Sequence, residues 1–100
     1  MTLAYITCKD HKEAKRISVQ LLRKRLIACA NIFPIGSIYW WKGKIVNDNE
    51  NVVIAKTNNK NFSKVVKEVK KIHSYAIPCI LKIGATANKD YGQWANKEIR

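Results

Sequence analysis

Two long segments of the chain are rich in β-branched and aromatic residues, a pattern that favours β-strands. They comprise residues 28–41 and 45–57, and a short Lys-Gly-Lys connection lies between them. Side chains of these types prefer pleated, half-buried surfaces, and Gly43 can adopt the positive φ of a tight turn. Arms of this length extend roughly 40 to 45 Å at about 3.3 Å per residue. A domain of this size has a diameter on the order of 33 Å, so we predict a hairpin that protrudes from it.

The predicted hairpin carries features that favour association between chains. Trp40 and Trp41 come directly before the turn. A protruding edge with two exposed tryptophans favours aggregation unless other chains cover it, so we expect an oligomer built on hairpin contacts. Pro34 cannot donate a ladder hydrogen bond and predicts a bulge, a bend or a sheet edge. The polar interval at residues 47–51 is expected to face solvent or to contain a bulge.

Two segments show the apolar spacing of amphipathic helices. The first helix is expected to cover about 15 residues. It begins at a capping box in which Asp10 accepts a backbone donor and Glu13 reaches back. Its apolar stripe comprises Ala14, Ile17, Ser18, Leu21, Leu22 and Leu26. The second stripe, after turn residues 58–61, comprises Phe62, Val65, Val66, Val69, Ile72 and His73.

The remaining apolar segments complete an α+β order of elements. Residues 3–7 and 79–85 are predicted strands, and residues 88–90 precede a short helix that carries Tyr91, Trp94, Ala95 and Ile99. Two split βαβ units joined by a hairpin describe a ferredoxin-like antiparallel sheet with helices on one face. We therefore predict a ferredoxin-like βαββαβ domain over residues 1–100, with a terminal helix and a long protruding hairpin.

Composition narrows the class of protein. The chain has 100 residues and a formal net charge of +12. Its lysines and arginines are spread along the sequence, so we interpret them as solvated faces and regard nucleic-acid binding through the sheet as an alternative. Three cysteines without regular spacing indicate a reducing cytoplasm rather than a disulfide framework. No segment has the apolar length of a membrane span, and residues 1–6 are too short for a secretory signal.

Five short segments, spread over nearly the whole chain, form a series. The most distinctive is residues 37–45, Ser-Ile-Tyr-Trp-Trp-Lys-Gly-Lys-Ile, and the supporting ones are residues 28–32, Glu50 with 54–57, residues 73–80, and Tyr91 with Trp94. This series resembles the motifs of the CutA family of divalent-cation tolerance proteins. The resemblance implies a compact homotrimer of ferredoxin-like subunits, related in architecture to the PII signalling proteins. It also implies copper binding and metal tolerance, without an established catalytic activity.

The chain departs from the family pattern within residues 73–80. Ala76 and Cys79 stand where the family motif has acidic residues, and Ser74 stands where it has proline. A metal or ligand role of those acidic side chains is therefore not assumed for this chain.

Cys29, His73 and Cys79 are the candidate metal ligands. Thiolate and imidazole groups suit soft or borderline metals such as copper or zinc. The spacing matches no closed zinc motif, and the alternative is that the cysteines are buried and His73 caps helix carbonyls. Cys8 and His11 form a second candidate pair at the first strand–helix turn.

Six further residues are expected to line a cleft between subunits or to pack in an interface. They are Tyr39, Trp40, Trp41, Lys56, Tyr75 and Trp94. PII-like trimers place ligands between subunits, so by analogy of fold a small anionic ligand is one occupant. The chain has no glycine-rich phosphate loop and only seven acidic residues, which leaves few candidates for acid–base chemistry and predicts a protein that is not an enzyme.

The sequence therefore predicts a cytoplasmic homotrimer of the CutA type that binds copper or another divalent metal and acts in metal tolerance or signalling. A basic ferredoxin-like module that binds nucleic acid is the first alternative. A structural trimer without a ligand is the second.

Overall fold

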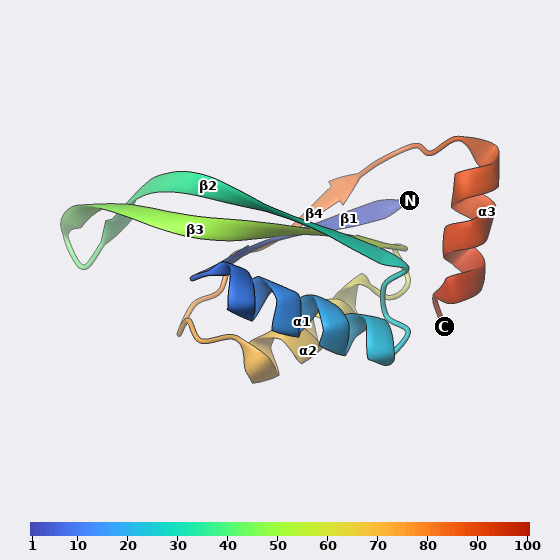
Figure 1. The fold of residues 1–100 in the computed structure, drawn as a ribbon, viewed down its shortest axis with the longest axis horizontal. Helices are drawn as coiled ribbons and strands as arrows, with labels where there is room; N and C mark the ends of the chain where they lie inside the picture. The colour runs from blue at the N-terminus through green and yellow to red at the C-terminus, as the bar shows by residue number, and fades with distance from the viewer.

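The computed structural model describes residues 1–100 as one sheet with helices on one side (Figure 1). The predicted α+β order is confirmed as βαββαβα. Its elements are β1 (Thr2–Cys8), α1 (His11–Arg23), β2 (Cys29–Trp41), β3 (Lys44–Thr57), α2 (Phe62–Ile72), β4 (Ile80–Gly84) and α3 (Lys89–Glu98). α1 and α2 lie side by side on one face of the sheet, and α3 lies beyond the end that is far from the hairpin (Figure 1).

The sheet is antiparallel, in the order β2-β3-β1-β4. β2 is therefore an edge strand, and this explains how Pro34 is accommodated without a donor. Pro34 lies opposite Asn51 in an uninterrupted register between β2 and β3. Of the three possibilities that the proline predicted, the sheet edge is present and the bulge is absent. The same register continues through residues 47–51, which also contain no bulge.

The predicted hairpin is confirmed, and each of its four strand ends agrees to within one residue. β2 and β3 pair from Cys29 opposite Lys56 to Trp41 opposite Lys44, and the longest axis of the molecule measures 45 Å. The two residues of the turn, Lys42 and Gly43, have φ values of 50° and 77°. Positive φ at both central positions is the type I′ pattern, whose twist matches that of the flanking strands.

The hydrophobic core lies between the sheet and the helices. Alternate residues of β1 are buried, as a strand with one covered face requires. The fully buried side chains in this core include Ile6, Ile17, Leu21, Val53, Val65 and Val69. Both predicted helical stripes therefore face the sheet, except at Leu22, which is 38% exposed because it lies at the margin of its stripe. The charged sides of α1 and α2 lie in solvent.

The other face of the sheet is only partly covered within one chain. Residues directly opposite each other in register share a face, so Leu3 and Ile83 form one pair there and Tyr5 and Leu81 form another. Ile83 is 42% exposed and Leu81 is 50% exposed. Phe33 of the edge strand is exposed as well. Along β2 the same face leads on to Tyr39 and Trp41, whereas Ile38, Trp40 and Ile45 lie on the opposite side of the hairpin.

The first turn of α1 differs from the predicted capping box in one bond. Asp10 Oδ1 accepts from the Glu13 backbone N–H at 2.8 Å, as expected. Glu13 reaches back to the N–H of Lys9, at 3.1 Å, instead of the N–H of Asp10. Its second carboxylate oxygen is thereby free to contact residues outside the helix.

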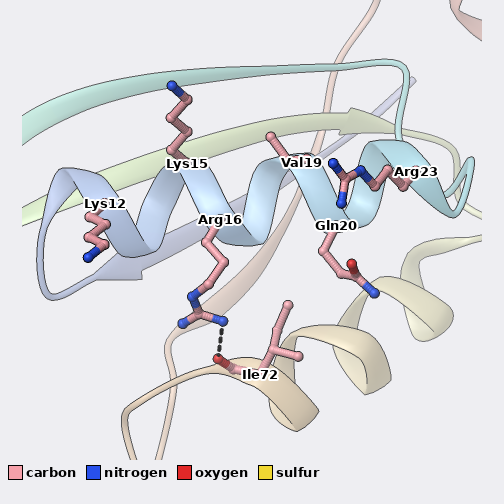
Figure 2. A pocket seen from close by; sticks show the side chains of 7 residues that line it. All are labelled: Lys12, Lys15, Arg16, Val19, Gln20, Arg23 and Ile72. Carbon is pink, nitrogen blue, oxygen red and sulfur yellow. Dashed lines mark hydrogen bonds between the residues drawn. The ribbon is translucent and has the colours of Figure 1, made fainter.

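Polar contacts fasten α1 to α2. Arg16 Nη1 donates to the carbonyl of Ile72 at 2.9 Å, across the two helices (Figure 2). Further along, Glu68 of α2 accepts from Lys24 at 2.9 Å and from Gln20 at 3.2 Å. The two helices therefore form one rigid layer on the sheet.

Candidate functional site

The structure places Cys29 and His73 at different ends of the sheet. Cys29 lies opposite Lys56, which in turn lies opposite Leu3 of the central strand. His73, just after α2, contacts the carbonyl of Thr7 with its Nε2 atom at 2.8 Å. Leu3 and Thr7 are separated by roughly 13 Å along the strand. Within one chain these two predicted ligands therefore do not share a site.

Cys79 lies at the same end of the sheet as His73. It is half-buried and lines a cleft together with Thr7 and Ser74. A metal site that uses Cys29 together with the other two predicted ligands consequently requires a second copy of the chain.

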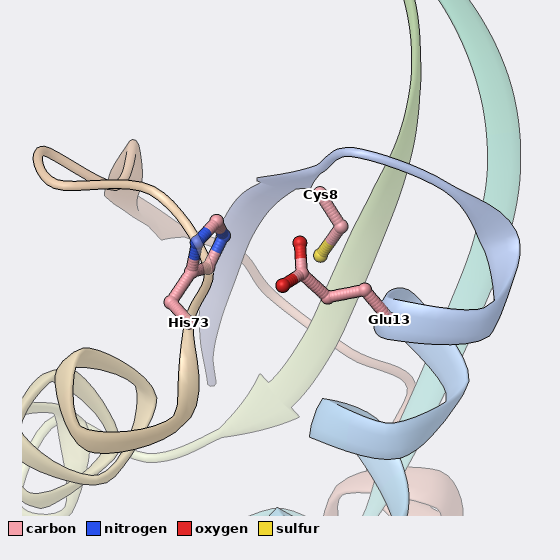
Figure 3. Close-up of side chains that lie close together, drawn as sticks. All are labelled: Cys8, Glu13 and His73. Carbon is pink, nitrogen blue, oxygen red and sulfur yellow. The ribbon is translucent and has the colours of Figure 1, made fainter.

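The side chains that do meet within one chain are Cys8, Glu13 and His73 (Figure 3). Their ligand atoms all lie within 4.8 Å of one another. They come from the end of β1, the first turn of α1 and the residue after α2. Cys8 is fully buried and Glu13 is 2% exposed, whereas His11, the predicted partner of Cys8, is exposed.

Glu13 was missed as a member of a site because the sequence suggested only its local capping role. A signal was present: Glu13 lies four residues before Ile17, on the apolar stripe of α1, so its side chain points toward the core. A carboxylate on a buried stripe must find several hydrogen-bond donors.

The hydrogen bonds of His73 fix its tautomer. Nδ1 accepts from the Tyr75 backbone N–H at 3.0 Å, so this nitrogen carries no proton. Nε2 must therefore hold the proton and donate it to the Thr7 carbonyl. Both ring nitrogens are engaged, and neither has a free lone pair for a metal.

Both carboxylate oxygens of Glu13 likewise accept hydrogen bonds. In addition to the Lys9 bond, its Oε2 atom accepts from the Ser74 backbone N–H at 2.9 Å and from Arg16 at 3.3 Å. Burial by itself raises the pKa of Glu13, but the hydrogen bonds from Ser74 and Lys9 outweigh it and lower the pKa below the ordinary value of 4.5. The carboxylate is therefore charged at neutral pH.

Cys8 stays a neutral thiol beside this carboxylate. Burial, followed by the charges of Glu13 and Glu50, raises its pKa to about 12. A thiol in this state is a poor metal ligand because the thiolate is the coordinating form. Cys8, Glu13 and His73 therefore form a satisfied polar cluster that ties β1, α1 and the end of α2 together.

A cleft of about 680 Å³ opens between the distal half of the hairpin and the segment before β4. Its lining contains three of the six predicted cleft residues, namely Tyr39, Trp41 and Tyr75, together with Thr7, Ser37, Ile38, Glu50, Ser74, Ala76, Ile77 and Cys79. The Tyr75 hydroxyl donates to Glu50 at 2.6 Å. Burial, followed by this bond and the charge of Glu50, raises the pKa of Tyr75 above its ordinary value.

The other three predicted residues lie elsewhere. Lys56 is 5.3 Å from the centre of the Tyr91 ring and 3.9 Å from Cys29 Sγ, and Trp94 packs on the same ring at 5.4 Å. Trp40 is 72% exposed on the hairpin. The cleft of one chain thus contains a carboxylate and no lysine or arginine, so an anionic ligand there requires a cation from a second copy.

The fold defines the class of protein. The PII-like protein CutA from Nostoc sp. PCC 7120 superposes on the chain with a TM-score of 0.92 at 22% identity, covering 100% of this chain and 98% of that one. At this identity the likeness is one of fold. The chain therefore shares the α+β fold of that protein.

The family follows from closer matches. The model of the CutA1 divalent ion tolerance protein matches residues 2–98, and the chain belongs to this family. The divalent-cation tolerance protein CutA of Archaeoglobus fulgidus is 44% identical over 96 residues, which cover 95% of this chain and 94% of that protein. A solved structure of the periplasmic divalent cation tolerance protein CutA from A. fulgidus has a TM-score of 0.97 at 42% identity and covers both chains fully.

The structure contains three helices, α1, α2 and α3. None of the three is long and apolar enough to cross a membrane.

Proposed function

We propose that the protein acts in divalent-cation tolerance as a homotrimer that takes up copper or another divalent metal between its subunits. The observation that carries this proposal is the separation of two partly exposed thiols, Cys29 and Cys79, at opposite ends of the sheet. Cys29 and Cys79 can bind the same metal ion only when they come from two copies of the chain. The relatives' names support the role in cation tolerance.

Association is supported by the surface that one chain leaves uncovered. Trp40, Ile38 and Ile45 are 72%, 73% and 64% exposed on the hairpin. Exposed apolar side chains of this kind, which lie on the other side of the hairpin from the open apolar face of the sheet, mark an interface. In the trimer, the cleft lined by Tyr39, Trp41 and Tyr75 receives a neighbouring copy, and Lys56 and Trp94 of that copy complete the interface.

The function that we propose is binding and not catalysis. Glu13, in the polar cluster with Cys8 and His73, already accepts hydrogen bonds. Glu50, which lines the cleft, accepts one from Tyr75. His73 joins the two cysteines as a third ligand when its Nδ1 atom is released from the Tyr75 N–H. Free thiols suit a reducing compartment, and we place the protein in the cytoplasm.

Native mass spectrometry of the reduced protein, with and without added copper, tests the proposal. We expect a trimer that takes up a fixed number of ions per chain. Cys29→Ser and Cys79→Ser should each abolish stoichiometric uptake, His73→Gln should weaken it, and the exposed control His11→Asn should leave it unchanged. A monomer at micromolar concentration overturns the trimer. A trimer with only scattered adducts removes the metal and leaves a structural trimer.

A further inference from the structure

Folding gathers the basic residues that the sequence spreads out. Residues 9–25 and 60–71, which form the helix layer, contain twelve lysines and arginines and three carboxylates, a net formal charge of +9 out of the chain's +12. The twelve are Lys9, Lys12, Lys15, Arg16, Arg23, Lys24, Arg25, Lys60, Lys64, Lys67, Lys70 and Lys71, and all are exposed. The rest of the chain carries only +3.

Most of these cations have no carboxylate partner. Arg16 pairs with Glu13, Lys24 and Lys71 with Glu68, and Arg25 with a residue of α3. The other eight have no carboxylate oxygen within 4.0 Å. Glu13 and Glu68 are 2% and 6% exposed, so the outer surface of the layer presents almost unopposed positive charge.

Four of the twelve cations line a shallow groove on α1 (Figure 2). The groove has a volume of about 540 Å³ and is lined by Lys12, Lys15, Arg16, Val19, Gln20, Arg23 and Ile72. Arg16 is held in place by its bond to the Ile72 carbonyl. Lys12 and Arg23 are separated by roughly 16 Å along the helix, a length over which a nucleic-acid duplex carries about ten phosphates.

The other side chains of the layer distinguish among polyanions. The only large apolar side chain exposed on it is Leu22, at 38%, so the layer has no apolar stripe to insert into a lipid surface. The exposed aromatic residues lie on β2 and α3, so the helix layer itself has no stacking platform for single-stranded bases. Of the polyanions considered, the helix layer therefore suits the phosphate backbone of a duplex.

We propose that the outer surface of α1 and α2 is a docking surface for the phosphate backbone of double-stranded nucleic acid, without base specificity. This surface lies on the side of the sheet opposite the open apolar face (Figure 1). Association through that face therefore leaves the basic layer accessible. The binding requires no metal and is independent of the metal proposal.

Fluorescence anisotropy of the full chain with a labelled random-sequence DNA duplex of about 20 base pairs tests the inference across a salt series. We expect the logarithm of affinity to fall with the logarithm of salt concentration with a slope near −4 to −5, as for about five phosphate contacts. Affinity should then drop on the order of several hundred-fold between 50 and 200 mM salt.

A matched pair of triple variants locates the surface. Lys15→Gln, Lys64→Gln and Lys67→Gln together should reduce the steepness of the salt slope by about two to three. Lys44→Gln, Lys89→Gln and Lys97→Gln change the charge equally on the rest of the molecule and should reduce it by less than about one. All six side chains are exposed, and circular dichroism verifies that both variants are folded.

Three results overturn the inference. The first is equal loss in the two variants, which assigns binding to net charge alone. The second is tighter binding to a single strand than to the duplex. The third is binding to phosphatidylserine vesicles with no binding to the duplex, which assigns the layer to a membrane surface.

Discussion

The apolar side chains under the helix layer and those on the hairpin have opposite surroundings. Ile17 of α1 is fully buried by the sheet, whereas Ile38 of β2 is 73% exposed. The first group is satisfied within one chain, and the second has no partner there. A single chain therefore buries the apolar side chains of its helical half and leaves those of its hairpin exposed.

The two regions also differ in how they treat charge. The helix layer buries two carboxylates, Glu13 and Glu68, and supplies each with several donors. Its cations remain outside. The hairpin instead exposes indole and aliphatic surface. The molecule thus has one surface suited to water and polyanions and another suited to protein contact.

The largest effect that tests this comparison is on folding stability. Ile17→Ala removes a fully buried side chain and should lower the free energy of unfolding by roughly 2–5 kcal/mol. The stability of any oligomer depends on protein concentration, but the difference between Ile17→Ala and the parent should not. Urea denaturation monitored by circular dichroism measures it. A loss below about 1 kcal/mol contradicts the burial of Ile17 within one chain.

An intermediate effect is expected on association. Trp40→Ala leaves the interior of one chain unchanged but removes exposed indole surface, and it should raise the dissociation constant of the oligomer at least about tenfold, or 1.4 kcal/mol. Leu22→Ala is the matched control, since Leu22 is an exposed apolar residue of the helix layer. Sedimentation velocity over a dilution series compares them, and equal shifts contradict the assignment of the interface to the hairpin.

Features encoded by neighbouring residues could be predicted from the sequence. The hairpin followed from the β-branched and aromatic runs around Gly43, and the start of α1 followed from Asp10. In each case the determining residues lie within a few positions of one another, so local geometry alone fixes the outcome.

Features that depend on tertiary approach could not be predicted. The bond from Ser74 to Glu13 joins residues 61 positions apart, and that from His73 to Thr7 joins residues 66 apart. Cys29 and His73 looked compatible as ligands because sequence does not reveal distance along a sheet. The basic layer was missed for the same reason, since residues 9–25 and 60–71 meet only when the two helices pack side by side.

The smallest effect concerns the pH dependence of stability and the two buried carboxylates. Hydrogen bonds lower the pKa of Glu13 in the folded state, and bonds from Lys24 and Gln20 lower that of Glu68. A carboxyl group with a lower pKa in the folded state stabilises the protein above its unfolded pKa, near 4.5, and loses this contribution as pH falls through the folded value.

Stability should therefore be constant near neutral pH and decline below about pH 4.5. Glu13→Gln should be less stable than the parent at pH 7, and the difference should shrink at pH 3, where the parent carboxyl becomes protonated. Glu98→Gln is the control, since Glu98 pairs with Arg25 at the surface. Urea titrations at the two pH values measure the difference. If the deficit of Glu13→Gln is as large at pH 3 as at pH 7, the charge of Glu13 is not what holds β1, α1 and α2 together.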